Sequence, residues 1–199
     1  KIAYSFGPTE IINKEGTIIY ADGGEFRTQI SQTEISSGNI ETSEYILDGD
    51  KLFFDDFNQY YLGEGNVKLT SKENNLILLG DEGYHDKVNG YSKIYGNAIM
   101  KKIMKLDTFY IAADTMMAIE SEYDSVRRIL AYPDIRIFKM NVQGISDSSA
   151  YFLADSIIML YQNPILWTGQ NQVLSDTIAI HLNDSSIEKM DLKRNAFLI

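Results

Sequence analysis

The histidines and one acidic pair are the residues whose types could support catalysis or metal binding. His85 and His181 are the only histidines in the 199 residues. A metal site or a nucleophile–histidine pair needs further partners at suitable spacing, and the sequence assigns none. Asp55 and Asp56 are adjacent, and neighbouring strand side chains point to opposite faces. A solvated turn is therefore favoured over the paired carboxylates of a glycosidase. We expect no catalytic residue, no metal and no cofactor.

Glycines and recurring aspartates are the next candidates for a ligand site. Gly63-Glu64-Gly65 lacks the third glycine and the following helix of a dinucleotide-binding loop. Aspartates such as Asp22 and Asp50 recur along the chain and could be interpreted as calcium ligands. They stand without clustered partners, so a turn or capping role is favoured.

These aspartates belong to a repeat that extends over most of the chain. One marker is a small residue followed by Asp: Ala21-Asp22, Gly49-Asp50, Gly80-Asp81, Ala113-Asp114, Ser146-Asp147 and Ser175-Asp176. The other contains Asn with a small residue or Pro: Gly38-Asn39, Gly65-Asn66, Gly96-Asn97, the degenerate Tyr132-Pro133, Asn163-Pro164 and Asn195-Ala196. The two series alternate, each with a period of about 31 residues, which indicates stacked supersecondary units.

Each marker precedes a short run with strand chemistry. Examples are Lys51–Phe54, Val67–Thr70 and Thr177–Ile180, which are bounded by Gly, Asn, Asp and Ser. Turn-forming residues lie at Ser71–Asn75, Asp86–Gly90 and Asn183–Ser186. No segment is a convincing helix, and Ser121–Ala131 comes nearest. The sequence therefore predicts an all-β fold of about six tandem strand–turn–strand units.

The phase of the repeat predicts which side chains face the interior, because strand side chains alternate with a period of two. Positions at fixed offsets from the markers are mostly apolar. We expect the following residues to line the interior: Leu52, Phe54, Val67, Leu69, Met100, Met116, Ile135, Tyr151, Leu166, Ile178 and Ile180. Alternate positions carry Lys51, Lys68, Asp134 and Arg136. Trp167 is out of phase, and a core or rim role is favoured over ligand stacking.

Composition excludes several classes of function. The formal net charge is −10, which argues against nucleic-acid binding and against adsorption to anionic membranes through a polybasic patch. The chain has no cysteine, and hence no disulfide or thiolate chemistry. No apolar run reaches the length of a membrane span, and no signal peptide is visible.

The alternating markers resemble those of the LptA/OstA family, the periplasmic carriers of lipopolysaccharide, whose module also occurs in LptC and at the N-terminus of LptD. The residues that carry the resemblance are Gly65-Asn66-Val67, Gly96-Asn97-Ala98, Ala113-Asp114, Asn163-Pro164, Ser175-Asp176 and Asn195-Ala196. The resemblance covers residues 15–199 as one OstA-like domain, after a lead-in segment of residues 1–14. The sequence is compatible with a chain that continues further. The resemblance implies an antiparallel β-jellyroll, or folded-over sheet, around an apolar groove.

The resemblance also implies a function. The chain would be a periplasmic, non-enzymatic module, its signal peptide removed, that shields lipopolysaccharide acyl chains in the groove. It would assemble end to end as a bridge to the outer membrane, through edge-strand pairing with itself or with other Lpt-type modules.

Two alternatives stay open at this point. One is a structural or docking β-repeat domain of a larger envelope protein, with a closed core and no lipid ligand. The other is an enzyme on a parallel β-helix, which the lack of a clustered acidic or basic face disfavours. The basic groups Lys101-Lys102-Lys105, Arg127-Arg128 and Lys193-Arg194 either meet lipid phosphates at a groove mouth or, as favoured, form solvated strand edges.

Overall fold

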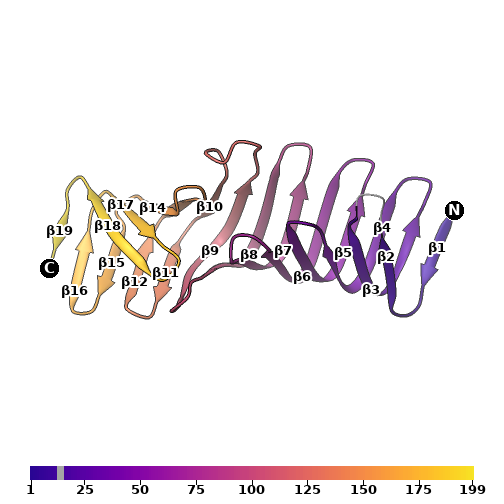
Figure 1. Cartoon of the computed structure of the whole chain (residues 1–199), viewed down its shortest axis with the longest axis horizontal. Coiled ribbons are helices and arrows are strands. Elements are labelled where there is room, and N and C mark those ends of the chain that lie inside the picture. The colour runs from indigo at the N-terminus through magenta and orange to yellow at the C-terminus, as the bar shows by residue number, and fades with distance from the viewer. Residues whose placement is uncertain (13–15) are drawn as a thin grey trace. The chain divides into compact units, whose positions relative to one another are not determined.

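In the residues that the structure describes, the regular elements are all β-strands. The computed structural model describes residues 1–12 and 16–199. The strands are β1 (Ile2–Ser5), β2 (Thr9–Ile12), β3 (Ile18–Arg27), β4 (Gln32–Glu41), β5 (Tyr45–Asp55), β6 (Tyr60–Ser71), β7 (Leu76–Asp86), β8 (Tyr91–Ile103), β9 (Thr108–Ile119), β10 (Arg128–Tyr132), β11 (Ile135–Lys139), β12 (Val142–Ser146), β13 (Ser148–Phe152), β14 (Ile157–Tyr161), β15 (Ile165–Thr168), β16 (Asn171–Leu174), β17 (Thr177–Leu182), β18 (Ile187–Lys193) and β19 (Phe197–Leu198). The predicted all-β, antiparallel, folded-over sheet is confirmed (Figure 1).

The chain divides into two compact units, Lys1–Gly96 and Asn97–Ile199, and β8 contributes residues to both. The predicted boundary between a lead-in segment and the domain, at residues 14 and 15, lies outside the described residues. The single domain over 15–199 stays a prediction. Among the described residues, no helix is long and apolar enough to cross a membrane.

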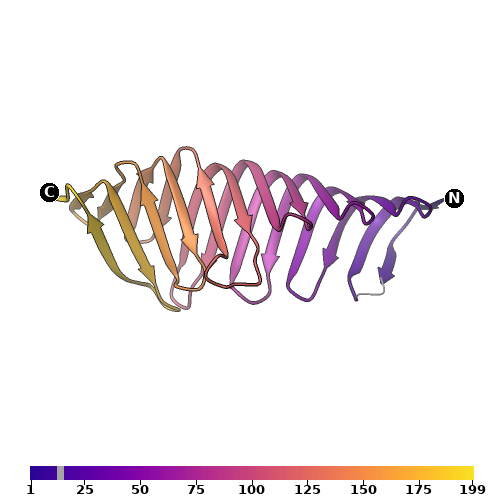
Figure 2. The same ribbon diagram turned by 90° about the horizontal axis from the view of Figure 1, so that it is seen from above.

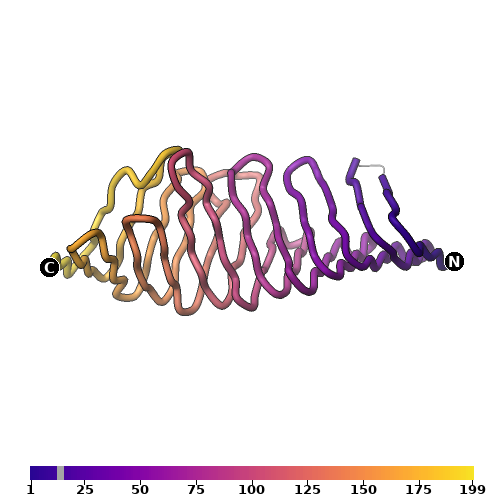
Figure 3. The backbone as a smooth tube through the Cα atoms, turned by 90° about the horizontal axis from the view of Figure 1, so that it is seen from below, coloured from indigo at the N-terminus to yellow at the C-terminus, as the bar shows by residue number. Residues whose placement is uncertain are grey.

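The N-terminal unit is a series of antiparallel neighbours. Strands β3 to β7 each pair with the next strand along the chain, and β3 also pairs with β1 and β2. The successive hairpins can be followed in Figure 3. The predicted turns at Ser71–Asn75 and Asp86–Gly90 connect these strands, as expected.

The markers do not end the strands of this unit, so the prediction of short runs bounded by markers is wrong for β3 to β7. It is also wrong for β8, which both units share, and for β9 of the C-terminal unit. Gly49-Asp50 lies inside β5 and Gly65-Asn66 lies inside β6. The register between β5 and β6 shifts there, and so does the register between β6 and β7. The physical reason is a β-bulge, which needs the same small and left-handed residues as a turn but bends a strand instead of ending it.

The bends fold the sheet of the N-terminal unit onto itself. Tyr45 pairs with Ser71 and His85 pairs with Tyr61, at opposite ends of β6. A straight strand would hold these ends roughly 33 Å apart. The rings of Tyr45 and His85 nevertheless lie 6.4 Å apart between centroids. The two halves of the strands therefore form two facing arms.

The C-terminal unit has the same two-armed design with shorter strands. One arm, arm I, pairs β11, β12, β15, β16 and β19 in that order. The other, arm II, pairs β10, β13, β14, β17 and β18. Strand β9 pairs with both β10 and β11, which joins the arms. Figure 2 shows the strands of this unit in two layers.

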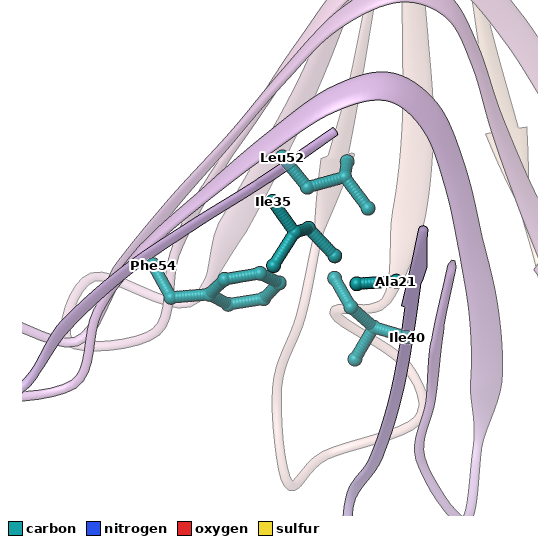
Figure 4. Packing of buried hydrophobic residues seen from close by; sticks show 5 residues of the cluster. All are labelled: Ala21, Ile35, Ile40, Leu52 and Phe54. Atoms are coloured by element: carbon teal, nitrogen blue, oxygen red, sulfur yellow. The ribbon is translucent and has the colours of Figure 1, made fainter. Parts of the chain in front are cut away.

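Side chains from the facing arms pack between them. In the N-terminal unit, Ala21, Ile35, Ile40, Leu52 and Phe54 form one buried cluster (Figure 4). They come from β3, β4 and β5, on both sides of the bends. The interior between the arms is thus the hydrophobic core.

Candidate functional site

The corners, where a strand passes from one arm to the other, explain why the two markers alternate. In the N-terminal unit the Asp of one strand meets the Asn of the next: Asn66 Nδ2 donates to Asp50 Oδ2 at 2.8 Å. Asn66 has a left-handed backbone with φ of 49°, and Gly65 has φ of 71°. A Cβ on Gly65 would lie 2.4 Å from Asp50 Oδ2. Only glycine therefore fits beside the aspartate at this corner.

Two corners of the C-terminal unit use buried serines, Ser146 and Ser175. Ser175 is 4% exposed and lies between β16 and β17. Its hydroxyl donates to the Thr177 carbonyl at 2.7 Å and accepts from Lys193 N–H at 3.0 Å. Ser146 is the last residue of β12, directly before the corner to β13, and its hydroxyl donates to the Tyr161 carbonyl oxygen at 2.7 Å. These hydroxyls satisfy backbone groups that the sheet leaves unpaired where the chain changes arms.

The same pairing of markers recurs at the last corner. Asn195 Nδ2 donates to the Asp176 carboxylate at 3.1 Å. Because these aspartates bond to asparagine amides, their role in the structure is to hold the corner. Among the described residues, no group of three or more His, Cys, Asp or Glu side chains could hold a metal ion.

The predicted lining residues face the space between the arms. Ten of them are at most 4% exposed: Leu52, Phe54, Val67, Met100, Met116, Ile135, Tyr151, Leu166, Ile178 and Ile180. Leu69 is partly buried. The alternate positions Lys51, Lys68, Asp134 and Arg136 are exposed. Whether the inward residues bind a ligand stays a prediction.

Further inward residues were not predicted, because the offsets were counted only forward from each marker. Among them, Ile35, Phe109, Ile111, Ile158 and Leu160 are at most 1% exposed. The period of two, counted back from the corner, would have found them. Burial raises the pKa of the Tyr151 phenol, which fits an interior of low polarity.

Trp167 and the two histidines have assignable surroundings. Trp167 is 39% exposed on arm I, consistent with its position out of phase. His85 Nδ1 lies 2.9 Å from the Ser92 hydroxyl, and His181 Nε2 lies 2.8 Å from Asp191 Oδ2. These bonds assign each histidine a polar neighbour within the fold.

The side of each unit opposite the corners is its mouth, where turns from the two arms approach each other. In the N-terminal unit the mouth is aromatic. Phe54 contacts Tyr61 at 5.5 Å between ring centroids, and Tyr61 contacts His85 at 5.6 Å. Tyr45 reaches His85 from the other arm. Apolar and aromatic side chains therefore extend from the interior to the surface.

In the C-terminal unit the mouth is charged. Lys139, which is 6% exposed, places Nζ 3.2 Å from Asp107 Oδ2. Asp107 also accepts from Thr108 N–H and Met140 N–H, and these backbone bonds lower the pKa of its carboxyl group. The contact ties the turn before β9 to the turn after β11. Across the mouth, Lys105 N–H donates to the Asp184 carbonyl at 2.8 Å.

This arrangement can enclose an apolar chain. Strand β9 joins the two arms of the C-terminal unit by pairing with β10 of arm II and β11 of arm I. The mouth is held by a few polar contacts between turns. A fold that is hinged at its corners and weakly held at its mouth can admit a slender apolar ligand sideways.

The comparisons with known proteins give a likeness of fold to solved structures. No family model and no curated protein matches the sequence. Among solved structures, the chain is similar to the crystal structure of LptH, the LptA homologous periplasmic component of the conserved lipopolysaccharide transport device from Pseudomonas aeruginosa. The match has 12% identity and a TM-score of 0.32 and covers 78% of this chain and 93% of that one. At these values the likeness carries no functional argument. The functional proposal below rests on the geometry of this chain.

Proposed function

We propose that the chain is a non-enzymatic carrier that binds the acyl chains of lipopolysaccharide between its two arms. The observation that carries the proposal is the apolar interior itself. It is lined from both arms, it repeats along successive strands, and it reaches a mouth where side chains and turns of the two arms meet. Such an interior needs no catalytic group to shield an apolar chain from water.

The energy of burial is sufficient for this task. Transfer of an acyl chain of about a dozen methylenes from water to an apolar site contributes on the order of 10 kcal/mol before ordering costs. Separating the two arms offsets part of this free energy of burial, because the side chains that face each other lose their contacts. Binding is favourable if the ligand replaces the contacts that these side chains lose.

The proposal extends to location and partners. We propose that the module lies in the periplasm, as the resemblance of its sequence markers implies. There it would form part of a route for lipopolysaccharide toward the outer membrane. Exposed apolar side chains lie beside the outermost strands: Tyr4 and Phe6 at β1, and Phe197 and Leu198 on β19. Edge-strand pairing with another copy or with another Lpt-type module would cover them.

Photo-crosslinking to lipopolysaccharide tests the proposal. A photoreactive residue replaces Met116, Ile180 or Leu69, which face the interior, or Lys68, the outward control on β6. We expect crosslinks from the inward positions and none from Lys68. Folded variants that give no crosslink at any inward position would contradict the proposal.

A structural or docking domain without lipid is the second candidate, and one observation favours it. Ile178, Ile180 and Leu166 are 0% exposed, as in a closed, dry core. In that case the repeat serves as a spacer, and the crosslinking experiment gives no product. The two functions are thereby separated by one measurement.

A further inference from the structure

Two lysines stand at the mouth of the C-terminal unit, on either side of the end of β8. Lys102 lies two residues after Met100 on the same strand, so it belongs to the inward column. It is partly buried, whereas Met100 is 1% exposed. Lys105 lies in the following turn, which a Met104 N–H bond to the Asp107 carbonyl closes at 3.0 Å. The column of inward side chains on β8 therefore ends in the ammonium group of Lys102.

A carboxylate from arm II reaches Lys105 and acts on Lys102. Asp184 is at the tip of the hairpin between β17 and β18, whose strands belong to arm II. Its Oδ2 lies 3.7 Å from Lys105 Nζ, and its charge acts on Lys102 as well. The side chains of Asp184 and Lys105 are 89% and 71% exposed. An ion pair this exposed is weak and exchanges readily with another anion.

We propose that Lys102 and Lys105 form a binding site for a phosphate monoester at the head of an amphiphile, and that the Asp184 carboxylate holds this position until the phosphate displaces it. The inference rests on the proposed function, since it places the headgroup of the ligand whose acyl chains enter the interior. In this proposal the hairpin of β17 and β18 closes the mouth, and binding of the ligand releases the hairpin.

The chemistry favours a phosphate over a neutral headgroup. Two ammonium groups, one at the end of β8 and one in the turn that follows, match the charge and the several acceptor oxygens of a phosphate monoester. The chain as a whole carries −10, so this pair is a local exception and not part of a general basic surface. Burial lowers the pKa of the Lys102 ammonium, and a bound dianion would offset that cost.

The neighbouring lysine is not part of the site. Lys139 also faces inward at the mouth, but its Nζ is held by Asp107 at 3.2 Å and by Asn141 Oδ1 at 3.2 Å. Asp107 is in turn fixed by two backbone N–H groups. This pair is built into the turns, unlike the exposed pair at Asp184.

The experiment compares the dissociation constants of lipopolysaccharide and phosphatase-treated lipopolysaccharide, with inorganic phosphate as a third probe. The proteins are the wild type, the double variant K102Q/K105Q, D184N and the control K68Q. Lys68 is a matched control because it also pairs with an aspartate, Asp48, at 3.4 Å, but on the outer face of β6. Circular dichroism verifies that each variant is folded.

The expected pattern is specific. The wild type prefers the phosphorylated ligand by about tenfold or more, as two charge-assisted contacts would give. K102Q/K105Q loses this preference and K68Q keeps it. D184N binds the phosphorylated ligand roughly threefold more tightly, since the competing carboxylate is gone. Inorganic phosphate alone binds much more weakly than the lipid.

Other outcomes overturn the inference in distinguishable ways. If the wild type binds neither form of the lipid, the proposed function fails and the inference fails with it. If it binds both forms equally, or if K102Q/K105Q keeps the preference, only the phosphate site is wrong. If inorganic phosphate binds as tightly as the lipid, the site recognises a free anion and not a headgroup.

Discussion

The two units of the molecule turn the same kind of corner with different chemistry. In the N-terminal unit, continuous strands bend at glycine–asparagine bulges, and the side chains that hold the bend lie near the surface. In the C-terminal unit, most corners separate two strands, and at two of them a buried serine hydroxyl bonds to the backbone around it. The comparison shows that a repeat can form the same bend in two ways. One uses residues that tolerate a left-handed backbone, and the other uses hydrogen bonds from a buried side chain.

The difference extends to the interior. Large side chains of the C-terminal unit such as Ile158, Leu160 and Leu166 are 0% exposed. In the N-terminal unit several inward side chains, including Phe26, Leu47 and Tyr61, are only partly buried. We therefore expect the C-terminal unit to lose more stability from interior truncations and the N-terminal unit to be more sensitive at its glycines.

The largest effect is expected from a truncation inside the C-terminal unit. Ile178→Ala removes a fully buried side chain and leaves a cavity, which costs about 2–5 kcal/mol. Leu69→Ala in the N-terminal unit removes a partly buried side chain and costs less than about 2 kcal/mol. Urea unfolding of both variants measures the difference. Equal losses would contradict the contrast between the two interiors.

A smaller effect is expected at a serine corner. Ser175→Ala removes the hydroxyl that pairs with Thr177 and Lys193 and leaves buried backbone groups unsatisfied, which costs about 1–3 kcal/mol. Ser125→Ala, at an exposed position, is the control and changes stability by less than about 0.5 kcal/mol. Thermal unfolding compares the pair. A loss for Ser175→Ala no larger than for the control would show that the corner does not depend on the hydroxyl.

The glycine corner is tested by Gly65→Ala. The left-handed backbone costs a non-glycine residue about 1–2 kcal/mol, and the added Cβ meets the Asp50 carboxylate. Gly7→Ala is the control, because a Cβ there meets nothing within 4 Å. In an Asp50→Ala background, Gly65→Ala should cost less, because only the backbone strain remains. An unchanged cost in that background would rule out the steric contribution.

The smallest effect concerns acid, and both units should share it. The pKa of Asp55 is lowered by the Asn58 backbone N–H and by Gln32, and that of Asp107 by the Thr108 and Met140 backbone N–H groups. Each folded-state pKa lies below the unfolded value of about 3.9. Their stabilisation is therefore present above about pH 4 and is lost as the pH falls through the folded-state pKa.

Asn variants at the two positions test this behaviour. D55N and D107N each lose stability at neutral pH and show a shallower decline of stability below about pH 4 than the wild type. Unfolding midpoints measured from neutral to acidic pH provide the comparison. A decline as steep as in the wild type would mean that these carboxylates are not the groups that titrate.

Sequence reasoning located the inward columns well because a buried face imposes a strict period of two. It placed Ile178 and Met116 inward and Lys68 outward, as the structure has them. It misread the corners, since Gly65-Asn66 satisfies a bulge as readily as a turn. It favoured a solvated edge for Lys102 over a place at the groove mouth and did not single out Lys139, because charged side chains were expected to face solvent, although the period from Met100 and Ile137 points both inward. Partners from arm II, such as Asp184 for Lys105, can be identified only once the three-dimensional structure is known.

The central claim is that the arms are fixed at the corners and open at the mouth to admit acyl chains. Spin labels on cysteines test it directly, because the chain has no native cysteine. One pair, M140C/A154C, spans the mouth of the C-terminal unit, and a second, D147C/N163C, marks its corners; all four positions are exposed. The account predicts that lipopolysaccharide lengthens the distance across the mouth and leaves the corner distance unchanged. An unchanged mouth distance with lipid bound, or equal changes in both pairs, would contradict it.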